Sequence, residues 1–122
     1  MSKRILVIED EPALLRAIGE ALTMDGFQAM TAVDAEQGMA LLRDARPNLI
    51  LLDLILPGKN GFEVLKELKA SPEYSKIPVI ILSNLGDEEE IQQGLKLGAA
   101  NFLIKADYDL AGIVGIVKKY LK

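Results

Sequence analysis

The sequence predicts an α/β fold, a three-layer, doubly wound sandwich in which helices cover both faces of a five-stranded parallel sheet. Three observations support this prediction. Five short apolar segments alternate strictly with five amphipathic helical segments, as in parallel α/β sheets. The run 49–56 is apolar except at Asp53, which is typical of a central strand buried on both faces. Right-handed crossovers between five strands favour the strand order 2-1-3-4-5.

The strands are expected where apolar and β-branched residues cluster between turn signals. They are Arg4–Glu9, Phe27–Ala32, Leu49–Asp53, Val79–Leu82 and Asn101–Ile104. Pro78 opens the fourth strand, a position that tolerates a residue without an N–H group.

The helices are expected where capping residues precede an apolar periodicity of 3.6. Pro12 begins the first helix and Gly26 ends it. Asp34, Asn60 and Asp87 precede the next three helices, and the last is expected over 108–121. The side chains expected to face the core are Leu14, Leu15, Ile18, Leu22, Met39, Leu41, Leu42, Phe62, Val64, Leu65, Leu68, Ile91, Leu95, Leu97, Leu110, Ile113, Val114, Val117 and Leu121.

The composition restricts both the organisation and the chemistry. A chain of 122 residues without linker or repeat predicts a single domain, residues 1–122. No apolar run is long enough to span a membrane and no signal peptide is evident, so a cytoplasmic protein is expected. The net charge of −4 argues against nucleic-acid binding. Cysteine and histidine are absent, which argues against zinc and favours a hard cation such as Mg²⁺ with oxygen ligands.

Reactive side chains follow four of the five predicted strands. Glu9 and Asp10 stand at the end of the first, Asp53 ends the third, Ser83 ends the fourth and Lys105 follows the fifth. The carboxyl ends of parallel strands share one edge of the sheet, where such folds bind ligands. Taken alone, each residue has a simpler explanation: Asp53 and Ser83 as turn residues, Lys105 as a surface lysine. Together they predict a site.

Three adjacent carboxylates repel one another unless they share protons or a cation. A magnesium ion is the natural neutraliser, and it leaves a coordination position for a phosphoryl oxygen. A carboxylate can attack phosphorus to form an acyl phosphate, while a lysine and a hydroxyl stabilise the transferred group. The five side chains supply these parts.

The chain resembles the receiver domain of bacterial two-component response regulators over nearly all of its length, and this family implies a flavodoxin-like fold. The matching pieces are Glu9-Asp10, the segment 53–61, Ser83, Gly98-Ala99 and Lys105 after the segment 102–104. Gly61 and Gly98 themselves are interpreted as residues that mark helix ends, where the backbone conformation favours glycine.

The resemblance implies a role for each matched residue. Asp53 would accept the phosphoryl group, Ser83 would bond it and Lys105 would neutralise it. Asp10, Asp53, the carbonyl of Ile55 and, through water, Glu9 would hold Mg²⁺, with Mn²⁺ as the alternative ion.

Phe102 occupies the position of the family's rotating aromatic, which turns inward when Ser83 moves toward the phosphate. A purely core-forming role for Phe102 remains the alternative. Ser83 and Phe102 would thus form a switch read out on the face of the fourth helix, fifth strand and last helix.

Two departures from the family pattern affect the edges of the site. Ala106 follows Lys105 where the family usually has a cis proline, and a cis bond without proline costs about 3 kcal/mol, so a trans bond and an altered loop are expected. Ile55 and Leu85 place apolar side chains at two variable positions beside the site. They are expected to restrict water and slow loss of the phosphoryl group.

The main functional prediction is a phosphoacceptor switch that takes its phosphoryl group from the phosphohistidine of a sensor kinase or phosphotransfer protein. It would catalyse only its own phosphorylation and slow dephosphorylation, and so would not be a turnover enzyme. The alternatives are a pseudo-receiver that only binds proteins, and a flavodoxin-like cofactor binder or small phosphatase. The loop 10–12 would repel a cofactor phosphate, and Ile55 stands where a phosphatase needs a second aspartate.

The expected partners are the phosphodonor and a downstream protein. Because the last predicted helix reaches the end of the sequence, a stand-alone receiver or relay intermediate is expected. A monomer is expected, and dimerisation upon phosphorylation stays open.

Overall fold

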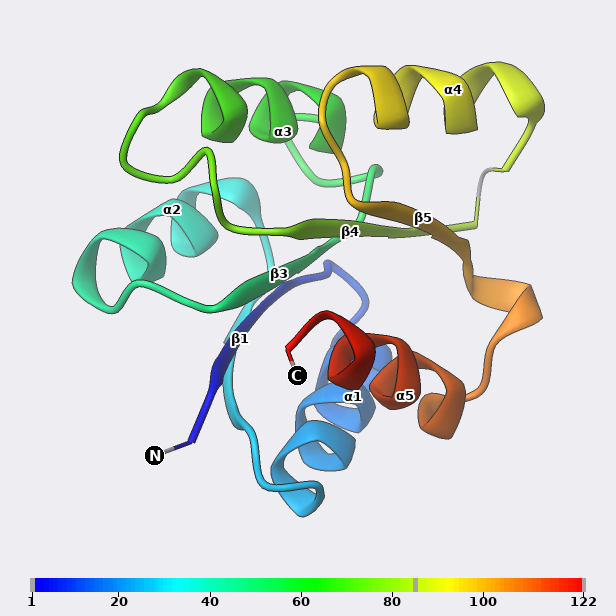
Figure 1. Cartoon of the computed structure of the whole chain (residues 1–122). Coiled ribbons are helices and arrows are strands. Elements are labelled where there is room, and N and C mark those ends of the chain that lie inside the picture. The colour runs from blue at the N-terminus through cyan, green and yellow to red at the C-terminus, as the bar shows by residue number, and fades with distance from the viewer. Residues whose placement is uncertain (1, 85, 122) are drawn as a thin grey trace.

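A computed structural model describes residues 2–84 and 86–121 as five strands and five α-helices that alternate along the chain (Figure 1). All strand pairs are parallel, in the order β2-β1-β3-β4-β5, as the sequence predicts. The strands are β1 (Arg4–Ile8), β2 (Gln28–Ala32), β3 (Leu49–Leu52), β4 (Val79–Ser83) and β5 (Asn101–Ile104). The helices are α1 (Pro12–Met24), α2 (Ala35–Asp44), α3 (Gly61–Ala70), α4 (Glu88–Lys96) and α5 (Leu110–Tyr120).

The helices form two layers, with α2, α3 and α4 on one face of the sheet and α1 and α5 on the other (Figure 1). Successive strand residues point to opposite faces, so each strand contributes to both cores. In β1, Leu6 and Ile8 join the core under α2, α3 and α4, whereas Ile5 and Val7 join the core under α1 and α5. This double burial explains why the central strands are apolar at every position.

Side-chain caps begin three helices at the predicted residues. The carboxylate of Asp34, the amide oxygen of Asn60 and the carboxylate of Asp87 each accept a hydrogen bond from a backbone N–H three residues later. Each cap satisfies one of the unpaired donors at a helix start. The starts of these three helices could therefore be predicted from the sequence.

The last helix begins later than predicted. Residues Lys105–Asp107 form a single 3-10 turn, and α5 starts at Leu110 because the carboxylate of Asp109 accepts a hydrogen bond from the N–H of Gly112 at 2.7 Å. The predicted start at Tyr108 is therefore wrong.

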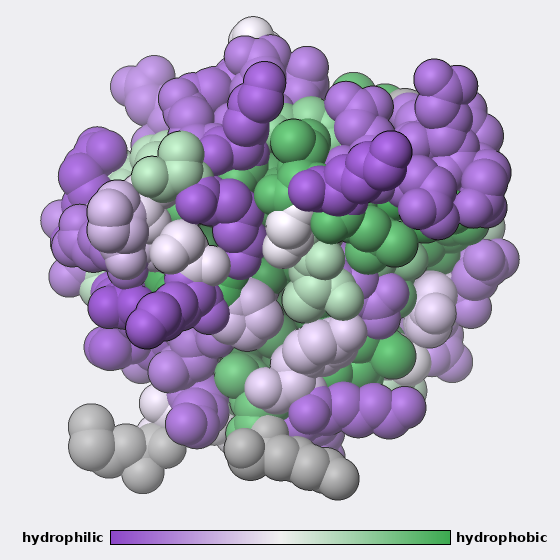
Figure 2. All heavy atoms as spheres, turned by 45° about the horizontal axis from the view of Figure 1, so that its top comes forward, coloured by the Kyte–Doolittle hydropathy of each residue, from purple (hydrophilic) through white to green (hydrophobic). Residues whose placement is uncertain are grey.

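The prediction of a core position is also wrong for two residues. Leu110 and Leu95 are 37% and 41% exposed, whereas the other side chains predicted to face the core are buried or pack partly against it. In α4 the buried residue is Gly94. The next residue, Leu95, points away from the core. Seen from the side of α3 and α4, the surface is largely hydrophilic, with small hydrophobic areas between polar side chains (Figure 2).

Candidate functional site

The strand ends bring the predicted site residues to one edge of the sheet. Ile8 and Leu52 are in register across β1 and β3, so Glu9 and Asp53, the residues that follow them, begin the loops at this edge. The N–H of Asp53 donates to the carbonyl of Ile8 at 3.0 Å, which extends the ladder by one residue. Glu9 and Asp53, predicted as the last strand residues, therefore lie just beyond β1 and β3.

Three carboxylates converge at this edge. One oxygen from each of Glu9, Asp10 and Asp53 lies within 4.8 Å of the other two. Glu9 and Asp53 are 2% and 4% exposed, whereas Asp10 is open to solvent. Two of the three charges are thus removed from water, which is unfavourable unless a cation compensates them.

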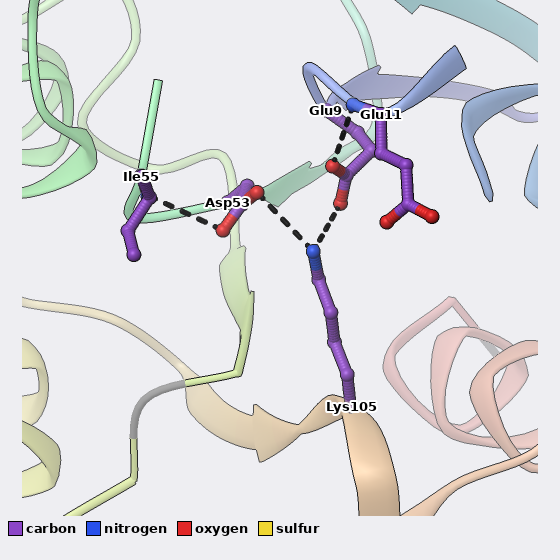
Figure 3. Close-up of polar contacts among 5 residues, drawn as sticks. All are labelled: Glu9, Glu11, Asp53, Ile55 and Lys105. Atoms are coloured by element: carbon purple, nitrogen blue, oxygen red, sulfur yellow. Dashed lines mark hydrogen bonds and ion pairs between the residues drawn. The ribbon is translucent and has the colours of Figure 1, made fainter. Parts of the chain in front are cut away.

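Lys105 reaches into the site from the opposite side. Its ammonium lies 2.7 Å from Oε1 of Glu9 and 3.2 Å from Oδ2 of Asp53, and Figure 3 shows the side chain extended between the two acids. Burial alone would lower the pKa of Lys105, but the bond to Glu9 and the charges of Asp53 and Glu9 raise it above its ordinary 10.5. Lys105 therefore stays charged and partly neutralises Glu9 and Asp53.

Glu9 is the group least satisfied by the protein alone. Its Oε2 accepts a hydrogen bond from the N–H of Glu11 at 3.0 Å, but its buried Oε1 has no partner with hydrogen-bond geometry among the described residues, despite the ion pair with Lys105. Burial raises the pKa of Glu9 to about 7, and the bonds to Lys105 and Glu11 only partly oppose this. A half-satisfied buried carboxylate beside two others fits a site for a hard divalent cation.

The loop after β3 supports Asp53. The N–H of Ile55 donates to Oδ1 of Asp53 at 3.3 Å (Figure 3), while the Ile55 side chain is 53% exposed. Ile55 thus lies beside Asp53, as the sequence predicted. Leu85, the second apolar residue expected at the site, lies outside the described residues.

Gly61 shapes this loop in a way that the sequence did not reveal. A Cβ at Gly61 would lie 2.4 Å from the carbonyl oxygen of Asp53 and 2.7 Å from Cα of Leu54, and the N–H of Gly61 donates to the carbonyl of Leu54 at 2.7 Å. The close approach of the backbone at Gly61 to the backbone of Asp53 and Leu54 therefore requires glycine. Its role goes beyond marking the start of a helix. Gly98 fits the predicted role, with a φ of +108° after α4.

Replacing Gly61 with alanine is expected to lower the free energy of unfolding by about 2 kcal/mol, because the added Cβ meets backbone that has no room to move. Chemical denaturation with circular dichroism measures this. The matched control is Gly115→Ala in α5, where a Cβ meets nothing within 4 Å. Alanine there should raise the free energy of unfolding by about 0.8 kcal/mol. Similar decreases in the free energy of unfolding of both variants would contradict the explanation that Gly61 is needed for close backbone approach.

The remaining predicted residues lie near this edge in different environments. Ser83 is fully buried at the end of β4, in register with Ile104, the residue before Lys105. Phe102 lies in the core on the side of α2, α3 and α4 and is 9% exposed. The bond between Lys105 and Ala106 is trans, as predicted. A 3-10 turn, Lys105–Asp107, follows β5.

Comparison with known sequences identifies relatives of one kind. A family model described as the response regulator receiver domain matches residues 5–117. The phosphate regulon transcriptional regulatory protein PhoB of Pseudomonas aeruginosa is 37% identical over 105 residues, which cover 86% of this chain and 46% of PhoB. The response regulator PleD of Caulobacter vibrioides is 38% identical over 105 residues, which cover 86% of this chain and 23% of PleD. The chain thus spans less than half the length of these relatives.

Solved structures show the same architecture. A CheY-like response regulator receiver domain protein from Methanospirillum hungatei superposes with a TM-score of 0.90 at 25% identity, covering 99% of this chain and 94% of that chain. The Mn²⁺-bound form of the response regulator Rcp1 superposes with a TM-score of 0.82 at 33% identity, covering 96% and 90%. The phosphorylated cyanobacterial phytochrome response regulator RcpA gives a TM-score of 0.84 at 37% identity, covering 98% and 91%.

Proposed function

Because the chain belongs to the family of response regulator receiver domains, we propose that Asp53 accepts a phosphoryl group from the phosphohistidine of a partner protein. The observation that carries the proposal is the convergence of Glu9, Asp10, Asp53 and Lys105 at one edge of the sheet. The structural neighbour RcpA is a phosphorylated response regulator, which supports phosphorylation of this chain.

The transfer needs little from the protein beyond position and charge. An Oδ atom of Asp53 attacks phosphorus, the O–P bond forms as the P–N bond of the phosphohistidine breaks, and the imidazole leaves after gaining a proton. Phosphoryl transfer of this kind is accelerated mainly by alignment and by neutralising the equatorial oxygens. Lys105 is positioned for the second task, since its ammonium lies 3.2 Å from Oδ2 of Asp53. We assign the Ser83 hydroxyl, at the end of the adjoining strand β4, to bonding one phosphoryl oxygen.

The acidic side chains fit a resident divalent ion. Asp10, Asp53 and Glu9 would hold it, with the carbonyl of Ile55 as a further ligand. Mg²⁺ is the first choice because all donors are oxygens, and Mn²⁺ is supported by the Mn²⁺-bound neighbour Rcp1. When bound, the ion supplies positive charge that offsets the carboxylates and the incoming phosphoryl oxygens.

The proposed partners follow from the same chemistry. The phosphodonor is a histidine kinase or a histidine phosphotransfer protein, and a downstream protein would bind the face formed by α4, β5 and α5. Among the described residues, no helix has the length and apolar character needed to cross a membrane.

Loss of the phosphoryl group requires water to attack phosphorus, so that Asp53 leaves as a carboxylate and inorganic phosphate is released. Ile55 lies next to Asp53 (Figure 3), and its side chain is 53% exposed. Ile55→Asn is expected to shorten the lifetime of the phosphorylated protein severalfold, because an amide can hold a water molecule that an apolar side chain excludes. Decay of the phosphorylated mass after removal of the donor measures this. An unchanged lifetime would count against a role for Ile55.

The proposed function is tested by intact mass after incubation with Mg²⁺ and acetyl phosphate. The wild type should gain one phosphoryl group, and Asp53→Asn should gain none. Asp44→Asn is a matched control at an exposed aspartate at the end of α2, and it should behave as the wild type does. Absence of the gain in the folded wild type would favour the pseudo-receiver, a binding module without phosphorylation.

A further inference from the structure

The loop between β3 and α3 contains the one Asn-Gly pair of the chain, Asn60-Gly61. In such a pair the backbone nitrogen of glycine, after giving up its proton, can attack Cγ of the asparagine side chain, because glycine has no Cβ to obstruct the approach. The N–Cγ bond forms, ammonia leaves and a succinimide ring remains. Water then opens the ring on either side. The product is aspartate, or isoaspartate, in which the main chain runs through the former side chain.

In the folded protein both reacting groups are engaged elsewhere. The N–H of Gly61 donates to the carbonyl of Leu54 at 2.7 Å, so the proton that must leave is held in a buried backbone contact. The amide oxygen of Asn60 accepts a hydrogen bond from the N–H of Glu63 at 3.0 Å, which fixes the side chain as the cap of α3. The extended ψ of 160° at Asn60 also turns the Gly61 nitrogen away from the eclipsed arrangement with Cβ that ring closure needs. The reaction therefore cannot begin until these contacts open.

We propose that Asn60 is a deamidation site that the folded loop 54–61 protects, so that Asn60 converts to aspartate or isoaspartate only when this loop opens. Both hydrogen bonds must break for the reaction, and each is typically worth about fivefold in the opening equilibrium. Deamidation should therefore be at least about 25-fold slower in the folded protein than in the unfolded chain. The inference does not rest on the proposed function, because the reaction needs neither Mg²⁺ nor a phosphodonor.

The two products differ in their effect on the loop. Aspartate keeps an oxygen at the position where Asn60 caps α3, and it is among the residues preferred there. Isoaspartate lengthens the main chain beside Gly61, where a Cβ would already lie 2.4 Å from the carbonyl oxygen of Asp53. The refolded isoaspartate form should therefore have a lower free energy of unfolding than the wild type, whereas Asn60→Asp should not. Chemical denaturation of both proteins measures this difference.

The site itself is tested by peptide mass spectrometry on the full chain kept at mildly alkaline pH, either in native buffer or in concentrated urea. Deamidation adds one mass unit, and a zero-time sample corrects for reaction during digestion. The matched control is Pro57→Asn, which places a second Asn-Gly pair in the same loop. Gly58 is exposed, and its N–H has no hydrogen-bond partner among the described residues. Trypsin cuts after Lys59, so the two positions fall in separate peptides.

The inference expects Asn60 to deamidate in urea and to react at least about 25-fold more slowly in native buffer. In folded Pro57→Asn, position 57 should react at nearly its rate in urea while Asn60 stays protected. The other asparagines should react slowly in both solvents, because leucine or phenylalanine follows each of them: Asn48, Asn84 and Asn101.

Similar rates at Asn60 in native buffer and in urea would overturn the inference, as would the absence of reaction at Asn60 in urea. Equal protection of positions 57 and 60 in the folded variant would also overturn it, because the fold as a whole, and not the two hydrogen bonds, would then be the cause. If Pro57→Asn fails to fold, the two wild-type rates still decide.

Discussion

Lys105→Met is expected to slow phosphorylation of Asp53 by acetyl phosphate about 100-fold. The ammonium of Lys105 lies 3.2 Å from the carboxylate of Asp53, the residue that we propose receives the negatively charged phosphoryl group. Removing one preorganised donor from such a site typically reduces the rate by about 100-fold to 1,000-fold. Methionine keeps the length and apolar stem of the side chain, so the loss reports the charge. The rate of gain of phosphorylated mass under saturating Mg²⁺ measures the effect.

Binding of Mg²⁺ by this variant separates a chemical role from a structural one. The ammonium lies 2.7 Å and 3.2 Å from two of the three carboxylates, so it competes with any other cation for them. Lys105→Met should therefore bind Mg²⁺ at least as tightly as the wild type in calorimetry. Lys76→Met, at an exposed lysine, is the control and should change neither the phosphorylation rate nor the affinity for Mg²⁺. If Lys105→Met lost Mg²⁺ binding as well as phosphorylation rate, the assignment of a chemical role to Lys105 would be contradicted.

The free energy of unfolding should fall as the pH rises from about 4.5 to 7, measured without divalent ions. Burial raises the pKa of Glu9 from 4.5 to about 7, so between these values the folded protein holds a proton that the unfolded chain has released. The stability that this group contributes is fully present below pH 4.5, falls progressively between pH 4.5 and 7, and is lost above pH 7. A shift of this size corresponds to at most about 3 kcal/mol.

The same measurement on Glu9→Gln isolates this group from the other titrating residues. The variant keeps the shape of the side chain but cannot ionise, so its unfolding free energy should lack this loss between pH 4.5 and pH 7. Saturating Mg²⁺ should reduce the loss in the wild type, because a cation favours the ionised form of Glu9. Parallel pH profiles of wild type and variant in EDTA would show that the burial of Glu9 does not govern its ionisation.

The sequence predicted most of the fold because its local signals agree with one another. The alternation of apolar strands and capped helices determines the sheet order, and the chemistry of Asp34, Asn60 and Asp87 marks helix starts without reference to the rest of the chain. The convergence of Glu9, Asp53 and Lys105 was also predictable, because parallel strands end at the same edge.

What the sequence did not predict depends on contacts between distant segments. Gly61 appeared to mark a helix start, yet its role is set by the backbone of Asp53 and Leu54. Leu95 was expected in the core from the apolar periodicity of α4. In the structure Gly94 is the residue of α4 that faces Ile81 and Phe102, and Leu95 is exposed. This orientation depends on contacts between distant segments, which the periodicity does not show. The ion pair between Glu9 and Lys105, and the raised pKa of Glu9, likewise require distances and burial.

The measurement that tests the central claim most directly is chemical trapping of the acyl phosphate. After reaction with acetyl phosphate, borohydride reduces an aspartyl phosphate to homoserine but leaves a serine phosphate intact. Peptide mass spectrometry should find homoserine at position 53 when Mg²⁺ is present, and aspartate there when EDTA replaces it. Homoserine at another aspartate, a phosphate ester on Ser83, or equal yields with and without Mg²⁺ would contradict the account.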